Sequence, residues 1–308
     1  MQSVIKQFNL FIDNEMEKRI TSGQQLSDTI GDLNRIAEAE EPAWLDTVDQ
    51  AAGKTYGTII LQEMTEISDS DFFSACTYAM GNNRGVLPSF IVRGLKERGP
   101  AAEAFLSEYL ASDILTADIN SSVLTKEQLY QTDMLSAAIQ LAGRLETDSM
   151  YIRLSEVFHR CISANEMFLE QLVEAMSSPA AEKHVLTLLE EDGLEDNKRV
   201  DAMQMVCNMH VKNDVLFLAM KRAFKRLGEP MQLVGAMLLF DYGDPRIVPL
   251  LRRVARDRIE KISVEKAQAQ RSGSEVKPDT TQVYILLSMI HKMGGDTEEL
   301  TGGADLFQ

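Results

Sequence analysis

The sequence is poor in the residues that stabilise small secreted proteins. Among its 308 residues are three cysteines, an odd number too small for a disulfide framework, which favours a reducing compartment. It has no run of about 18 apolar residues that could span a membrane. The first twenty residues lack the basic, apolar and small-residue order of a secretion signal. These absences predict a cytoplasmic protein without a membrane span.

Aromatic residues make up only 6% of the chain, and Trp44 is the single tryptophan. Alternating runs of β-branched and aromatic residues are missing, and no Asn-Gly or Asp-Gly pair joins two such runs, so hairpins are not expected. Apolar residues instead recur every three or four positions, as in Val4, Ile5, Phe8 and Ile12. This spacing is typical of helices that bury one face, and we predict an all-α fold.

Proline and glycine mark the ends of these helices. The turns Ser178-Pro179, Gly228-Glu229-Pro230 and Gly243-Asp244-Pro245 place proline where it suits the first turn of a helix. Between such breaks the pattern predicts about 14 to 16 helices of ordinary length. The polar segment 263–278 predicts a frayed helix end followed by a flexible loop, and 297–308 an acidic tail.

Positive charge is scarce overall but locally concentrated. The chain holds 31 Lys and Arg against 47 Asp and Glu, a formal net charge of −16, which disfavours nucleic acid as a partner. Residues 201–270 reverse this balance, with 12 basic and 8 acidic residues. Drift in surface composition is the simpler explanation. The functional explanation is a local basic surface for an acidic partner.

An internal repeat covers part of this basic region. When residues 201–228 are shifted by 31 positions onto 232–259, apolar positions fall on apolar positions through two predicted helices and their turn. The aligned pairs are Met203 with Val234, Val206 with Met237, Leu216 with Ile247, Ala219 with Leu250, and Met220 with Leu251.

The second copy of this repeat resembles a HEAT-type repeat. Residues 233–257 combine an apolar first helix, the turn Gly243-Asp244-Pro245 and a second helix that opens with Ile247-Val248-Pro249. The preceding copy, 198–227, departs from the pattern because Lys212-Asn213-Asp214 replaces Gly-Asp-Pro. The specific match is limited to about residues 198–260, roughly a quarter of the chain.

The resemblance implies stacked helical hairpins, a HEAT-like α-solenoid, in which neighbouring hairpins share one core. We expect HEAT-like repeats over 163–296. The N-terminal region, 1–162, is either a separate helical bundle or a set of atypical repeats. Families with this architecture mostly bind other macromolecules along their surfaces, which is an argument from fold alone.

Six cations recur within the repeat at the same shift of 31. They lie opposite the apolar positions of the second helices, so stacking would place the two trios side by side as a partner-binding surface. The simpler interpretation is a pair of solvated helix faces whose cations favour the helix C-termini. The six residues are Lys221, Arg222, Lys225, Arg252, Arg253 and Arg256.

Other features give little support for chemistry. Gly53-Lys54-Thr55 resembles the end of a phosphate-binding loop, but Val48 stands where that loop needs glycine. Cys207 and His210 lie one helical turn apart, and two ligands are too few for a structural zinc site. We therefore predict no cofactor, no metal site and no catalytic residue.

The function favoured by these observations is that of a non-enzymatic scaffold or adaptor that binds another protein. Two alternatives stay open. Some HEAT-like proteins are enzymes, such as lyases that attach a chromophore or glycosylases that act on DNA bases, although the acidic charge disfavours the latter. A secretion or assembly chaperone would also be acidic and helical.

Overall fold

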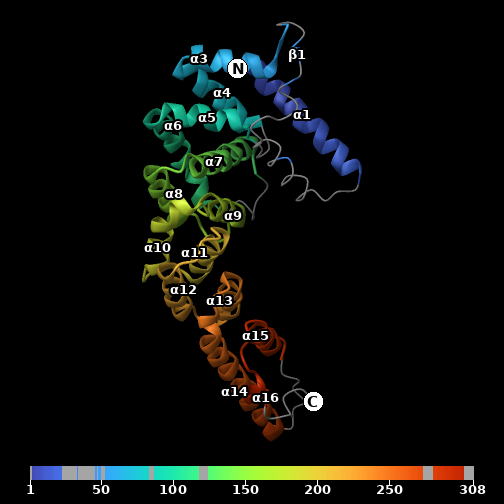
Figure 1. Cartoon of the computed structure of the whole chain (residues 1–308), viewed down its shortest axis with the longest axis vertical. Helices are drawn as coiled ribbons and strands as arrows, with labels where there is room; N and C mark the ends of the chain where they lie inside the picture. The colour runs from blue at the N-terminus through green and yellow to red at the C-terminus, as the bar shows by residue number, and fades with distance from the viewer. Residues whose placement is uncertain are drawn as a thin grey trace. The chain divides into compact units, whose positions relative to one another are not determined.

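The repeated helical spacing of the sequence is realised as a chain of α-helices in the computed structural model (Figure 1). The structure describes residues 2–22, 33, 46, 48–49, 53–82, 87–117, 124–272 and 280–301. Helices dominate these residues, which confirms the all-α prediction. The chain divides into two compact units, Met1–Met176 and Ser177–Gln308, so the division falls after the expected boundary at residue 162.

The helices of the first unit begin and end close to the breaks that the sequence predicts. They are α1 (Gln2–Thr21), α3 (Tyr56–Glu66), α4 (Asp69–Asn82), α5 (Ser89–Arg98), α6 (Pro100–Leu110), the 3-10 helix η2 (Asp113–Thr116), α7 (Lys126–Leu145), α8 (Asp148–Arg160) and α9 (Glu166–Ala175). In α1 the predicted apolar face is buried, including Val4, Ile5 and Phe8.

Helix α7 forms the centre of the first unit. It contacts α4, α5, α6, α8 and α9, and most of its length from Thr132 onward is buried. Small residues such as Ala138, Ala142 and Gly143 allow this, because they let neighbouring helix backbones approach closely. A capping box between Thr125 and Gln128 fixes where the helix begins.

One short β-hairpin in this unit was not expected. Strands β1 (Val48–Asp49) and β2 (Lys54–Thr55) pair antiparallel, with Val48 opposite Thr55. The prediction missed it because two residues per strand are too few to produce an alternating pattern. Gly53 makes the reversal possible with a φ of +64°, a conformation that favours glycine. Thr55 then caps α3, and Lys54 donates to Gln62 Oε1 at 2.7 Å, so both residues have local structural roles.

The second unit continues as helices joined by tight turns. Its elements are the 3-10 helix η3 (Pro179–Ala181), α10 (Glu182–Glu190), α11 (Asp196–Asn208), α12 (Asp214–Arg226), α13 (Glu229–Tyr242), the 3-10 helix η4 (Pro245–Ile247), α14 (Val248–Ser272), α15 (Thr281–Lys292) and α16 (Glu298–Thr301). Prolines 179, 230 and 245 each lie in a first helical turn, as predicted.

Packing in the second unit follows a regular order. Consecutive helices α10, α11, α12 and α13 contact one another in sequence. Helices two apart along the chain also pack together, α10 on α12, α11 on α13, and α13 on α15. These helices therefore pack against a sequence neighbour and, in three cases, against the corresponding helix of the next pair, whereas α12 and α14 are not such a pair.

The segment 263–278, predicted as a frayed helix end and a loop, and the segment 297–308, predicted as an acidic tail, both contain helical residues. Residues 263–272 continue α14, and residues 273–279 lie outside the described residues. The acidic segment 297–308 begins with α16, which contacts α14 and buries Leu300. In the acidic segment 297–308 the composition masks Leu300, whose side chain is buried, and in α14 the side chain of Ala269 is buried.

Candidate functional site

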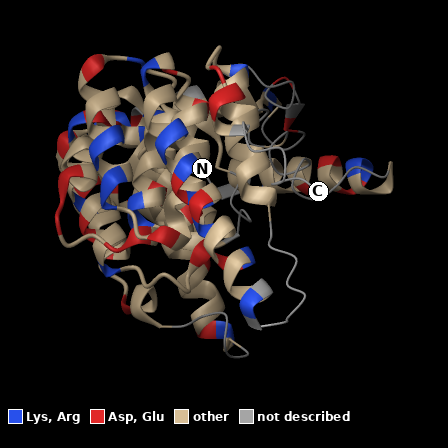
Figure 2. Ribbon diagram, turned by 90° about the horizontal axis from the view of Figure 1, so that it is seen from below, with Lys and Arg blue, Asp and Glu red and all other residues tan. Residues whose placement is uncertain are grey.

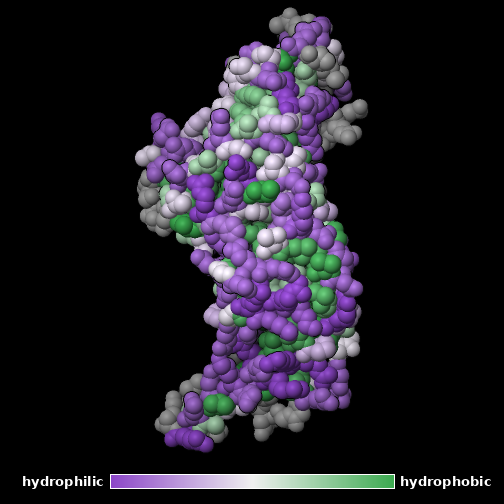
Figure 3. Space-filling model, turned by 90° about the vertical axis from the view of Figure 1, so that its left-hand side faces the viewer, coloured by the Kyte–Doolittle hydropathy of each residue, from purple (hydrophilic) through white to green (hydrophobic). Residues whose placement is uncertain are grey.

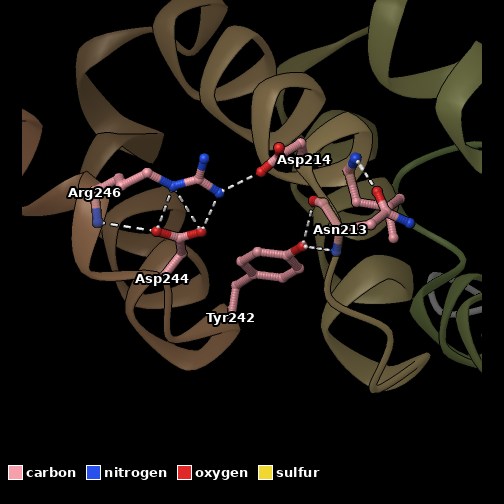
Figure 4. Close-up of polar contacts among 6 residues, drawn as sticks. Asn213, Asp214, Tyr242, Asp244 and Arg246 are labelled. Carbon is pink, nitrogen blue, oxygen red and sulfur yellow. Dashed lines mark hydrogen bonds and ion pairs between the residues drawn. The ribbon is translucent and has the colours of Figure 1, made fainter.

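A polar joint connects the helix pairs of the second unit where α12 begins (Figure 4). Asn213 caps α12 by accepting a hydrogen bond from the Leu216 amide at 2.8 Å, and its own amide group donates to Glu182 Oε1 at 3.1 Å. The hydroxyl of Tyr242 donates to the backbone carbonyl of Asn213 and accepts from the backbone N–H of Asn213, each at 3.1 Å. Asn213 thus links the start of α12 to α10, through Glu182, and to α13, through Tyr242.

Arg246 forms the second half of this joint (Figure 4). Its guanidinium binds both oxygens of Asp244, at 3.0 and 2.6 Å, and contacts Asp214 at 2.8 Å. It also lies over the Phe217 ring, 4.2 Å from the ring centre. These contacts lower the pKa of Asp244, chiefly through the hydrogen bond from Arg246, and raise the pKa of Arg246. The start of α12 is therefore fixed to η4, which leads into α14.

Further ion pairs repeat this arrangement along the unit. Arg222 pairs with Glu190 across α12 and α10, and Arg226 binds Asp192 at 2.9 Å. Glu229 at the start of α13 accepts from Lys261 and Arg258 of α14, and Lys261 makes the main contribution to lowering its pKa. In each pair the cation comes about one helix pair later in the chain than the acid. Figure 2 shows the result, with basic and acidic residues interspersed on the helices.

Two of the six predicted binding cations take part in such pairs. Arg222 contacts Glu190, one of the acids that precede α11, and Arg252 binds Glu299 of α16 at 2.7 Å. Both arginines therefore already have an acidic partner within the unit. Exposed ion pairs of this kind stabilise a fold by about 1 kcal/mol or less, so each arginine makes a weak contact between helices of the unit.

The other four predicted cations differ from these two. Lys221 is half-buried, whereas Lys225, Arg253 and Arg256 are exposed. Among the residues that the structure describes, none of the four makes an ion pair. The two trios lie on α12 and α14, and a continuous surface formed by all six residues stays a prediction.

Sequence reasoning missed a group of apolar residues beside the cations of α12. Val215 is 57% exposed and Leu218 is 47% exposed. With Arg222 and Lys225 they occupy positions i, i+3, i+7 and i+10, which follow one line along a helix. We call these four residues the α12 stripe. Figure 3 shows the side on which α10 and α12 lie in Figure 1, with hydrophobic residues among hydrophilic ones at the level of these helices.

The burial pattern corrects half of the repeat alignment. In the second helices the shift of 31 holds, because Leu216 and Ile247 are both buried, as are Met220 and Leu251. In the first helices it fails, since Met203 is buried and its aligned partner Val234 is exposed. A shift of 33 matches there instead, pairing buried residues throughout: Ala202 with Gly235, Met203 with Ala236, Met205 with Leu238, Val206 with Leu239, and Met209 with Tyr242.

The difference of two residues lies in the turn between the helices. In the turn between α11 and α12, His210 has the left-handed conformation, and Asn213, which caps α12, follows three residues later. The second turn has Gly243 in that conformation and reaches the Asp244 cap in the next position. A longer turn in the first copy thus explains why its sequence departs from Gly-Asp-Pro.

The cysteine and histidine pair gives no support for a metal site. The Cys207 thiol donates to the Leu238 carbonyl at 3.2 Å, and burial raises its pKa to about 12. His210 is exposed in the turn. Within the described part of the chain, no three His, Cys, Asp or Glu side chains gather as a metal site would require. No described helix combines the length and apolar content needed to cross a membrane.

Comparison of the chain with family models, curated proteins and solved structures found no match.

Proposed function

We propose that the chain is a non-enzymatic scaffold or adaptor that binds another protein through the second unit, a HEAT-like stack of helical hairpins. The packing of α10 on α12, α11 on α13 and α13 on α15 supports the stacked arrangement, because in such a stack neighbouring hairpins share one apolar core. The repeated burial at shifts of 33 and 31 supports the same interpretation.

The binding proposal depends on a difference among the cations of the second unit, some of which form ion pairs within the unit while others do not. Arg222, Arg226 and Arg246 join helices within the unit, whereas Lys225, Arg253 and Arg256 are exposed and make no ion pair with a described residue. Lys225 lies in the last turn of α12, where positive charge favours the helix dipole, whereas Arg253 and Arg256 lie within the long helix α14. A basic surface on a chain of net charge −16 favours an acidic protein as its partner.

The test is affinity capture from the cells that produce the protein. The wild-type chain is expected to retain a stoichiometric partner protein, and the double variant Arg253→Glu/Arg256→Glu to retain at least tenfold less. The control Arg93→Glu/Lys126→Glu makes the same change of net charge at exposed positions of the first unit. Helicity measured by circular dichroism should be equal in all three proteins.

Two outcomes would contradict the proposal. Equal recovery of the partner with the wild-type chain and the Arg253→Glu/Arg256→Glu variant would remove the cations from the function. Recovery of a bound pigment or nucleotide in place of a protein would favour the HEAT-like enzymes of the lyase type.

A further inference from the structure

The α12 stripe combines two kinds of surface on one line of a helix. Its N-terminal half presents Val215 and Leu218, each about half exposed, and its C-terminal half presents Arg222 and Lys225. Two exposed aliphatic residues one helical turn apart form an apolar surface that the aliphatic side chains of a partner can cover. The packing of α12 does not require them, because its opposite face already buries Leu216, Met220 and Phe224.

The charges around the stripe differ between its two ends. At the start of α12 the carboxylate of Asp214 is paired with Arg246. At the other end Arg222 and Arg226 pair with Glu190 and Asp192, and Lys225 is exposed and makes no ion pair with a described residue. The stripe therefore runs from an apolar half to a basic half, in which Arg222 is paired with Glu190 and Lys225 has no ion pair with a described residue.

We propose that the α12 stripe binds an acidic amphipathic helix of a partner protein, which lies antiparallel along α12. Aliphatic side chains of that helix would cover Val215 and Leu218, and carboxylates would lie beside Lys225 and Arg222. The inference rests on the proposed function and specifies its partner. Heptad-like spacing of the four residues matches the side chains of a second helix packed along the first.

The antiparallel direction follows from the charges of the two helices. In this orientation the partner's carboxylates occupy its own first turns, where negative charge complements the helix dipole. The cations of α12 occupy its last turns, where positive charge is also favoured. A phosphate backbone would match the cations but would leave Val215 and Leu218 uncovered, so a protein helix accounts for more of the stripe.

The test uses designed peptides and the full-length protein. The probe is a fluorescently labelled helical peptide that carries four contact residues on one line, separated by three, four and three positions. The first two of these residues are Glu and the last two are Leu. Two control peptides replace Glu by Gln or Leu by Ser. Binding is measured by fluorescence anisotropy at low and high salt. We expect binding of the probe to weaken with added salt, and each control peptide to bind at least tenfold more weakly.

Protein variants locate the site. Leu218→Ser should weaken probe binding about tenfold, since it removes most of the aliphatic surface at one turn. Lys225→Glu should weaken it by a similar factor. Ile152→Ser changes an equally exposed aliphatic residue of α8 in the first unit and should have no effect. Circular dichroism that matches the wild type shows that Leu218→Ser is folded, as its exposed position leads us to expect.

Several results would overturn the inference. The inference fails if Leu218→Ser leaves probe binding unchanged, or if the Gln control peptide binds as well as the probe. It also fails if the probe does not bind at millimolar concentration. Self-association of the chain that Leu218→Ser abolishes would make a second copy the occupant instead. If capture of the natural partner is lost with Arg253→Glu/Arg256→Glu but unchanged with Leu218→Ser, the proposed function stands and this inference fails.

Discussion

Asp244 has two separable interactions at the joint between α13 and η4. Its carboxylate caps η4 by accepting from the Arg246 amide at 2.9 Å, and it also pairs with the Arg246 guanidinium. An amide in the same place could still cap the helix but could not form the ion pair. Comparing Asp244→Ala with Asp244→Asn therefore separates the two interactions.

We predict that Asp244→Ala lowers the free energy of unfolding by about 1 kcal/mol through loss of the cap, and that Asp244→Asn lowers it less. The folded-state pKa of Asp244 lies below its ordinary value of 3.8. The ion-pair stabilisation is therefore complete above that value and is lost as the pH falls through the lower folded-state pKa. Urea unfolding measured from about pH 6 to about pH 2 should show that the free energy of unfolding falls less with decreasing pH in Asp244→Asn than in the wild type. Identical acid profiles would contradict the assignment.

Arg199 is a second residue whose role depends on its burial. It is 2% exposed, and its guanidinium donates to the carbonyls of Leu189, Glu191 and Leu194 at 3.0, 2.8 and 3.1 Å. These carbonyls lie at and beyond the end of α10, where a helix lacks internal donors. Burial is the main cause that lowers the pKa of Arg199.

We predict that Arg199→Ala destabilises the α10–α11 turn by about 3 kcal/mol, because three hydrogen bonds of about 1 kcal/mol each are lost. Amide hydrogen exchange of α10 and α11 should become about 100-fold faster. Arg199→Lys should recover only part of the protection, since one ammonium cannot reach three carbonyls in the planar geometry of a guanidinium. Equal protection in Arg199→Ala and the wild type would show that water replaces the side chain without cost.

At the scale of elements, close helix packing in the first unit depends on Gly143. A Cβ atom at this position of α7 would lie 2.7 Å from the carbonyl oxygen and 2.8 Å from the Cα of Ala175, at the end of α9. Both atoms belong to the backbone, so a side-chain rotation cannot relieve the overlap. Gly143 therefore sets the distance between α7 and α9.

We predict that Gly143→Ala destabilises the first unit by about 1–3 kcal/mol, although alanine favours a helix more than glycine does. Thermal unfolding of the full chain, followed by circular dichroism, measures the change. Gly193→Ala is the matched control, because no atom lies within 4 Å of the added Cβ and its φ is not left-handed. That variant should be neutral or slightly stabilising. A neutral result for Gly143→Ala would mean that α9 can move away from α7 at little cost.

At the scale of the whole molecule, net charge governs solubility. The formal charge of −16 at pH 7 opposes association of the chain with itself, and the isoelectric point of the sequence is 4.8. We predict that solubility falls to a minimum near that pH, measured by turbidity and light scattering at constant ionic strength. A variant with two further Asp or Glu residues at exposed Lys positions should move the minimum to lower pH. A minimum that does not move would indicate that a local patch, rather than net charge, controls association.

Much of the architecture could be predicted from local pattern. The three- and four-residue spacing of apolar residues predicted an all-α fold, and prolines 179, 230 and 245 marked helix starts that the structure contains. These features depend on the helical period and on the fixed φ of proline, and both act within one or two turns. The two-residue strands β1 and β2 were not predicted, because two residues are too few to show the alternation of apolar and polar residues that indicates a strand.

By contrast, only the tertiary structure decided which cations form ion pairs within the fold and which are left for a partner. Lys225 and Arg222 look alike in the sequence, yet Arg222 reaches Glu190, 32 residues earlier, whereas Lys225 makes no ion pair with a described residue. The exposure of Val215 and Leu218 and the two-residue difference between repeat turns were hidden for the same reason. Local sequence determines where helices form and which side is apolar, but the partner of each side chain is decided only when helices some thirty residues apart pack together.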